Sequence, residues 1–142
     1  MSTHDKTKIF HEVFGHPVAE KITLQDTKTR ELRLCLIAEE LVELAEGLNI
    51  PITIDIQGET TTRNYTTMRR GKPDMVLVAD ALADLDVVVN GAFLVFGLPN
   101  EALAQEVFDS NMSKLDNDMN PIYDEHGKIM KGPNYRNPDI AG

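Results

Sequence analysis

Apolar residues recur at helical spacing in two long segments of the chain. From Asp26 or Thr27, either of which can cap a helix, the apolar positions step by three and four as far as Leu48. The positions are Leu34, Ile37, Leu41, Leu44 and Leu48. We expect a helix here, with these residues on its core side. A second long helix is predicted from about Asp74 to Phe96, between Pro73 and the sequence "GLP".

Two shorter helices are predicted beside the long ones. One covers roughly Lys6 to Phe14 and ends at the sequence "GHP", because glycine and proline break helices. The other covers about Asn100 to Lys114. The four segments together predict an all-α, four-helix-bundle-type fold.

Two stretches lack the helical pattern. Residues 50–72 alternate isoleucine with polar residues and then become rich in threonine, which indicates a short hairpin or loop inserted between the long helices. Residues 116–142 are rich in Gly, Pro and Asn and form an irregular tail. Neither stretch has a core of its own, so we expect residues 1–142 to form one domain.

Composition narrows the choice of partners and compartment. The net charge is −9, which disfavours a nucleic acid polymer or an anionic membrane as a partner, because both attract basic patches. Acidic residues interrupt the longest apolar run, so we expect no membrane span. The first residues lack an apolar signal region, and there is a single cysteine, Cys35. Both features favour the cytoplasm.

Acidic residues lie within both long helical segments. Glu39, Glu40 and Glu43 fall on the side of the first long helix opposite these apolar positions, with Leu36 among them. Charged residues on such a side are usually solvated. The second long helix is apolar nearly all round and is therefore expected to be buried. It nevertheless carries Asp80 and Asp84, four residues apart on one side. Two like charges inside a buried helix require a metal cation or a basic neighbour, unless they lie on an exposed stripe beside an interface.

A site built from both helices would contain only oxygen ligands. Five carboxylates without thiolate or imidazole suit Mg²⁺, with Mn²⁺ or Ca²⁺ as substitutes, and do not suit zinc. A di-iron site of the ferritin type requires Glu-x-x-His pairs, and no histidine lies on either long helix. Residues 116–127 begin like a calcium loop but have Pro121 where glycine is needed and Gly127 where glutamate is needed, which excludes an EF-hand.

Four sequence blocks, in this order, resemble one enzyme superfamily. They are "FHEVFGHPV", "AEELVELAEG", "ADALADLDVVVNGAF" and "EVFDSNMSKLDND…GKIMKGPNY". The chain resembles the all-α nucleoside triphosphate pyrophosphohydrolases, the MazG-like and phosphoribosyl-ATP pyrophosphohydrolase superfamily, and within it the small single-domain branch of phage and bacteria. The resemblance implies a helical bundle that assembles as a homodimer or homotetramer.

The resemblance also implies an activity and a set of site residues. The activity is Mg²⁺-dependent cleavage of a nucleoside triphosphate between the α and β phosphates. The carboxylates that match the metal ligands are Glu39, Glu40, Glu43 and Asp84. The family usually has glutamate where Ala81 stands, so Asp80 as a ligand follows from its spacing and not from the match. Either Glu39 or Glu40 is expected to be the general base.

The resemblance further implies contacts to the phosphates or the nucleotide near the end of the chain. The residues are Ser110, Asn111, Lys114, Lys131 and Tyr135. An exposed lysine and a residue in a turn are equally simple interpretations of Lys131 and Tyr135. Phe10, His11 and His16 could touch the base or could be ordinary core and surface residues.

Two functions follow as hypotheses. The first is a Mg²⁺-dependent (d)NTP pyrophosphohydrolase, with dGTP or GTP as the substrate suggested by phage members of the branch. The second is a catalytically silent helical-bundle oligomer that binds nucleotides or other proteins. All four matched carboxylates are present, which favours the enzyme.

Overall fold

The computed structural model describes residues 1–141 and divides at residue 98 into two compact units. The first unit contains three helices and a hairpin, and the second contains one helix and the tail. The elements in chain order are α1 (Thr3–Phe14), α2 (Thr27–Leu48), β1 (Thr53–Gln57), β2 (Thr62–Thr66), α3 (Met75–Phe96) and α4 (Asn100–Met112). The predicted all-α class, its four helices and the hairpin insert are confirmed.

Local signals set the ends of the helices. Helix α1 begins earlier than predicted because Ser2 and Asp5 form a reciprocal capping box. The carboxylate of Asp26 caps α2 by accepting a hydrogen bond from the Thr29 amide at 2.8 Å, and α2 ends at Asn49 in the left-handed conformation. Helix α3 starts after Asp74, as predicted from the sequence.

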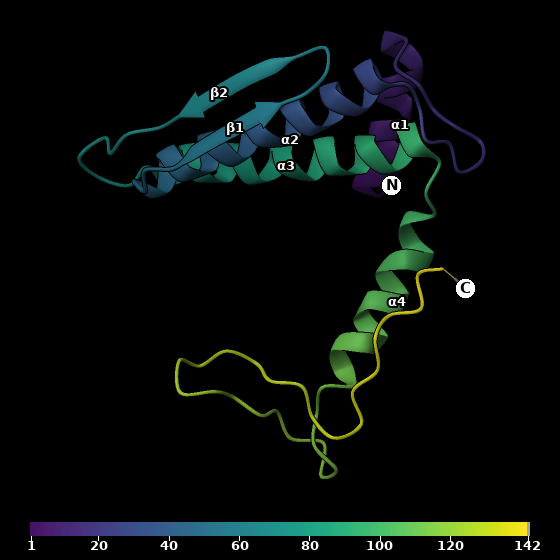
Figure 1. Ribbon diagram of the computed structural model, residues 1–142, viewed down its shortest axis with the longest axis vertical. Coiled ribbons are helices and arrows are strands. Elements are labelled where there is room, and N and C mark those ends of the chain that lie inside the picture. The colour runs from purple at the N-terminus through teal and green to yellow at the C-terminus, as the bar shows by residue number, and fades with distance from the viewer. Residues whose placement is uncertain (142) are drawn as a thin grey trace. The chain divides into compact units, whose positions relative to one another are not determined.

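Helices α2 and α3 form the long helical pair of the first unit (Figure 1). Helix α1 packs on the C-terminal half of α3, where a ring nitrogen of His4 lies 3.2 Å from the side-chain oxygen of Asn90. The chain between α1 and α2 runs beside the end of α3, since the amide of Ala19 donates to the Leu94 carbonyl at 2.9 Å. These contacts hold the three helices as one layered unit.

The hairpin covers one side of α2. Strands β1 and β2 are antiparallel, with Ile54 opposite Tyr65, and they lie along α2 (Figure 1). Ile56 is buried against Cys35 and Ala38 of α2, and Ile54 and Tyr65 pack around this small core. At the turn, the Thr60 hydroxyl and amide both donate to the Glu31 carboxylate.

The predicted core side of α2 is wrong in part. Leu34 and Leu41 are 55% and 42% exposed, and Leu48 is also exposed. The buried positions of α2 are instead Arg33, Cys35, Ala38, Val42, Ala45 and Gly47. Small residues allow α3 and the hairpin to approach α2 closely, so these elements pack on the sides with small side chains and leave the leucines outside.

The expectation that α3 is buried all round is also wrong for this chain. Several of its apolar side chains are exposed, namely Met75, Val76, Leu82, Val87 and Val89. Among the described helices and strands, α1 and α2 make the main contacts with α3, and two neighbouring helices cannot cover the whole circumference of a third.

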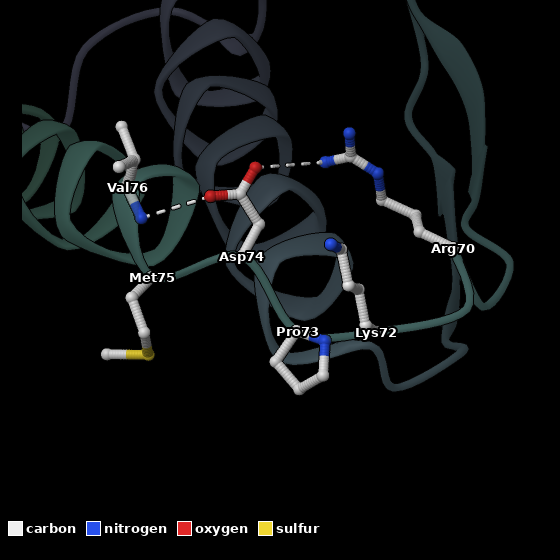
Figure 2. Close-up of a pocket in the computed structure, with 6 residues that line it drawn as sticks. All are labelled: Arg70, Lys72, Pro73, Asp74, Met75 and Val76. Atoms are coloured by element: carbon white, nitrogen blue, oxygen red, sulfur yellow. Dashed lines mark hydrogen bonds and ion pairs between the residues drawn. The ribbon is translucent and has the colours of Figure 1, made fainter.

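A cavity of about 450 Å³ lies at the start of α3, lined by Arg70, Lys72, Pro73, Asp74, Met75 and Val76 (Figure 2). The Asp74 carboxylate caps the helix through the Val76 amide at 3.1 Å and lies 4.0 Å from the Arg70 guanidinium. Both members of this ion pair are substantially exposed, so it contributes little to stability. None of the predicted site carboxylates lines this cavity.

Helices α2 and α3 approach each other closely at Gly47. A Cβ atom at this position would lie 2.8 Å from Cγ2 and 2.9 Å from the backbone nitrogen of Val78. A side chain can rotate away from such a contact, but the backbone cannot. Glycine at position 47 is therefore a requirement of the helix packing.

We expect Gly47→Ala to lower the free energy of unfolding by about 1–2 kcal/mol. Overpacking costs about 1–3 kcal/mol, and the better helix propensity of alanine offsets up to about 1 kcal/mol of that cost. Urea denaturation followed by circular dichroism measures the difference. An unchanged midpoint would show that the two helices separate without cost.

The second unit consists of α4 and the tail that folds back on it. The Ser110 hydroxyl donates to the Arg136 carbonyl at 2.9 Å, and the Arg136 guanidinium pairs with Glu106 at 3.0 Å. A Cβ at Gly132 would lie 2.5 Å from the carbonyl oxygens of Lys114 and Leu115. The tail therefore packs tightly against the end of its own helix.

Candidate metal centre

Three carboxylates from α2 and α3 gather in the first unit. One oxygen from each of Glu40, Glu43 and Asp84 lies within 4.8 Å of the other two. Glu40 and Glu43 are one turn apart on α2, so they face the same neighbour. That neighbour is α3, which packs on α2. Ala81, one turn before Asp84 on α3, is completely buried. We refer to these three residues as the acidic cluster.

Burial and mutual repulsion oppose the ionised form of Glu40. Desolvation, followed by the charges of Glu43 and Asp84, raises the pKa of Glu40 to about 7. The Oε2 atom of Glu40 is buried and has no hydrogen-bond partner in the described residues. A buried carboxylate oxygen without a donor is costly, and a cation coordinated by the cluster would remove that cost.

The acidic cluster fits a hard divalent cation. All three side chains offer oxygen, and all three are half-buried. Mg²⁺ binds through a few carboxylates and keeps several waters that can be exchanged for substrate phosphates. Mn²⁺ accepts the same oxygen ligands. Glu40, Glu43 and Asp84 are the residues that could hold the ion.

Glu39 lies beside the acidic cluster but outside it. Its side chain is exposed, and its Oε1 accepts a hydrogen bond from the Tyr65 hydroxyl at 3.3 Å. The hairpin insert therefore reaches Glu39, next to the acidic cluster, through Tyr65, a residue that no sequence pattern marks as part of the site. The available signal was the alternation of residues 52–56, which indicated a hairpin but not the surface on which it would pack.

Asp80 occupies a different position from Asp84. The prediction that both lie inside a buried helix is wrong, because Asp80 is exposed and is not part of the acidic cluster. Its charge is still close enough to help raise the pKa of Glu40. One turn of helix carries Asp80 beyond the surface that α2 covers.

The residues predicted to contact phosphates all lie in the second unit. Residues 110–114 and residues 131–135 lie close together, since Gly132 packs on the carbonyl oxygen of Lys114. Ser110 is buried and its hydroxyl holds the tail. Asn111 is exposed and Lys114 half-buried, and the Lys131 ammonium lies 4.7 Å from the centre of the Tyr135 ring. Their contact with phosphate stays a prediction.

The fold and the acidic cluster define an all-α protein with a candidate all-carboxylate cation site between two long helices. Residues 7–111 match the family described as phosphoribosyl-ATP pyrophosphohydrolase, and the chain belongs to this family. The expectation of a pyrophosphohydrolase enzyme is thereby confirmed, as is the superfamily suggested by the four sequence blocks.

The chain was also compared with solved structures and with curated proteins. A solved structure from Exiguobacterium sp. 255-15, described as a "putative NTP pyrophosphohydrolase", is similar to this chain with 25% sequence identity and a TM-score of 0.44. The similarity covers 98% of this chain and 90% of that one. No curated protein matches the chain. Within residues 1–141, no single helix is long and apolar enough to cross a membrane.

Proposed function

We propose that the protein hydrolyses a nucleoside or deoxynucleoside triphosphate between the α and β phosphates, with Mg²⁺ bound by the acidic cluster. The observation that carries this proposal is the buried, unpartnered Oε2 of Glu40 beside Glu43 and Asp84. Family membership supports pyrophosphate release as the type of reaction. When bound, the ion would neutralise the triphosphate and supply an acidified water.

The side chains divide the remaining work between them. Glu40, Glu43 and Asp84 would hold the ion through their carboxylate oxygens. Glu39 lies outside the cluster and is not committed to the ion, so we assign it the general-base role that the sequence leaves open between Glu39 and Glu40. It accepts the proton of the attacking water. The water oxygen bonds to the α phosphorus, the bond to the α–β bridging oxygen breaks, and pyrophosphate leaves.

The hydroxyl of Tyr65 supports this assignment. As a donor to Oε1 at 3.3 Å, it orients the Glu39 carboxylate on the exposed side of α2. Because it donates to one oxygen only, the other oxygen of Glu39 remains available to accept a proton.

The partners and the compartment are part of the same proposal. Large apolar side chains are exposed on all three helices of the first unit, including Phe14, Leu34 and Val76. Exposed apolar surface of this kind marks protein interfaces and supports a homodimer or homotetramer.

We place the enzyme in the cytoplasm, where its nucleotide substrates and a reduced Cys35 are both expected.

We expect the purified protein to release pyrophosphate from at least one of the eight common NTPs and dNTPs, in the presence of Mg²⁺, with a guanine nucleotide preferred. The measurement is a coupled pyrophosphate assay with product identification, which should give the nucleoside monophosphate. EDTA should abolish the release and Mn²⁺ should partly restore it, because both depend on the same oxygen ligands. Folded protein without turnover of any of the eight would instead support the catalytically silent alternative.

A further inference from the structure

A charged side chain, Arg33, is buried in the first unit without a carboxylate partner. It is 4% exposed. Its Nη2 donates to Nδ1 of His16 at 3.1 Å, and its Nε has no hydrogen-bond partner in the described residues. Burial lowers the pKa of Arg33, but a guanidinium remains protonated in proteins. A buried cation that lacks a counter-charge and has an unused donor is a costly arrangement unless a ligand completes it.

Arg33 lines a cavity of about 260 Å³ formed by α1, α2 and α3, within the first unit. The other residues that line it are Phe10, His11, His16, Leu36, Val87, Val88 and Gly91. The rings of Phe10 and His16 stack, with centroids 5.8 Å apart and planes inclined by 27°. Most of the lining is apolar or aromatic, so the cavity suits a planar, partly apolar group better than a hydrated phosphate.

His11, one of the two histidines that line this cavity, is held in one orientation. His11 is buried, and its Nδ1 lies 2.9 Å from the Pro17 carbonyl, which can only accept. Desolvation lowers the pKa of His11, so the ring is neutral near pH 7 with the proton on Nδ1. Its Nε2 faces Gly91, where a Cβ would lie 3.0 Å from that nitrogen and 3.5 Å from Nη1 of Arg33. The absence of a side chain at position 91 keeps this space open.

The cavity and the acidic cluster lie along the same helix pair. Arg33 precedes Glu40 by seven residues on α2, and Gly91 follows Asp84 by seven residues on α3. Seven residues are about two helical turns, or about 10 Å along the axis. A nucleotide with its phosphates at the acidic cluster can therefore reach the cavity with its base. This step rests on the proposed function.

We propose that this cavity is the base pocket and that Arg33 reads the O6 and N7 edge of guanine. Guanine presents two acceptors on that edge, which match two donors of a guanidinium. Adenine replaces O6 with an amino donor, which would face the positive charge. Thymine offers a single oxygen, and cytosine offers an amino group. The stacked rings of Phe10 and His16 provide an aromatic wall for the base.

Nucleoside binding tests this proposal separately from turnover. The full chain is titrated with guanosine, inosine, 7-deazaguanosine and adenosine in EDTA, by calorimetry or ligand-observed NMR. Inosine keeps both O6 and N7, so guanosine and inosine should bind at least about tenfold more tightly than adenosine. In 7-deazaguanosine a C–H replaces N7, so its affinity should lie between that of guanosine and that of adenosine. Nucleosides carry no phosphate and EDTA removes Mg²⁺, so a failure of the hydrolysis proposal would leave this result unaffected.

Two variants test whether Arg33 recognises the base. Arg33→Lys keeps the charge but loses the fork of donors, so the preference for guanosine over adenosine should fall about tenfold. Gly91→Ala keeps Arg33 but fills the space beside it, so it should weaken all four nucleosides. Glu46→Gln, on α2 but outside both the cavity and the acidic cluster, should bind guanosine like the wild type. Circular dichroism checks each fold, and Gly91→Ala decides the outcome if Arg33→Lys does not fold.

Three results would overturn the proposal. The first is that guanosine binds no better than adenosine or does not bind at all. The second is that both pocket variants bind guanosine like the wild type. The third is that inorganic phosphate displaces guanosine from the cavity, which would make it an anion site.

Discussion

Glu43→Gln and Asp84→Asn should each lower kcat/KM for the best nucleotide substrate by at least about 100-fold. Both residues belong to the acidic cluster, and each substitution replaces a charged ligand with a neutral amide of the same shape. Loss of an outer-shell partner in a metal site already costs about 10–100-fold, so loss of a ligand should cost at least as much. The measurement is pyrophosphate release at saturating Mg²⁺.

The same two variants should fold at least as well as the wild type when no metal is present. In EDTA the cluster holds three carboxylates close together, and removing one charge relieves repulsion. Urea denaturation in EDTA should therefore give a midpoint that is equal or higher. Glu46→Gln is the matched control, because Glu46 is on the same helix but outside the acidic cluster, and it should keep full activity. If both cluster variants remained active, the metal assignment would be refuted.

The stability of the metal-free protein should depend on the ionisation of Glu40. The pKa of Glu40 is about 7 in the folded protein, whereas an unfolded glutamate titrates near 4.5. Between these two values the folded state binds more protons than the unfolded state. The contribution of Glu40 to stability is therefore fully present below pH 4.5 and is lost as the pH rises through about 7.

Urea denaturation in EDTA between pH 5.5 and 8.5 measures this effect when wild type is compared with Glu40→Gln. The wild type should lose stability relative to the variant as the pH rises, and the difference should level off above pH 7. His11 acts in the opposite direction, because burial lowers its pKa, but both proteins contain it and its effect cancels.

Mg²⁺ should remove the pH dependence and stabilise the wild type. A cation favours the ionised form of Glu40, and binding to the folded state alone adds about 2.7 kcal/mol at 100 times the dissociation constant. Glu40→Gln should gain much less. Two results together would contradict the role of Glu40 as a ligand. The free energies of unfolding of wild type and variant would change in parallel with pH in EDTA, and Mg²⁺ would raise both by the same amount.

The secondary structure was largely predictable from the chain because its signals are local. Asp26, Asn49 and Asp74 act on backbone groups within a few residues, so helix ends can be inferred without knowing what the helix contacts. The hairpin insert follows from short-range alternation in the same way. The acidic character of the site was also visible, because spacing along α2 places Glu40 and Glu43 on one side.

The tertiary structure decided which sides of the helices meet. Both long helices carry apolar residues on more than one side, so periodicity cannot specify which side packs inside the chain and which remains outside. Helix α3 approaches α2 closely at Gly47, and Ala81 of α3 is completely buried. This packing brings Asp84 of α3 to Glu40, leaves Asp80 exposed, and leaves Leu34 and Leu41 on the outside.

The same packing buries Arg33 and brings Tyr65 to Glu39. The sequence alone determined the helices and the oxygen ligands that they carry. The shape of the site was decided by tertiary contacts, because burial and close approach depend on residues far apart in the chain.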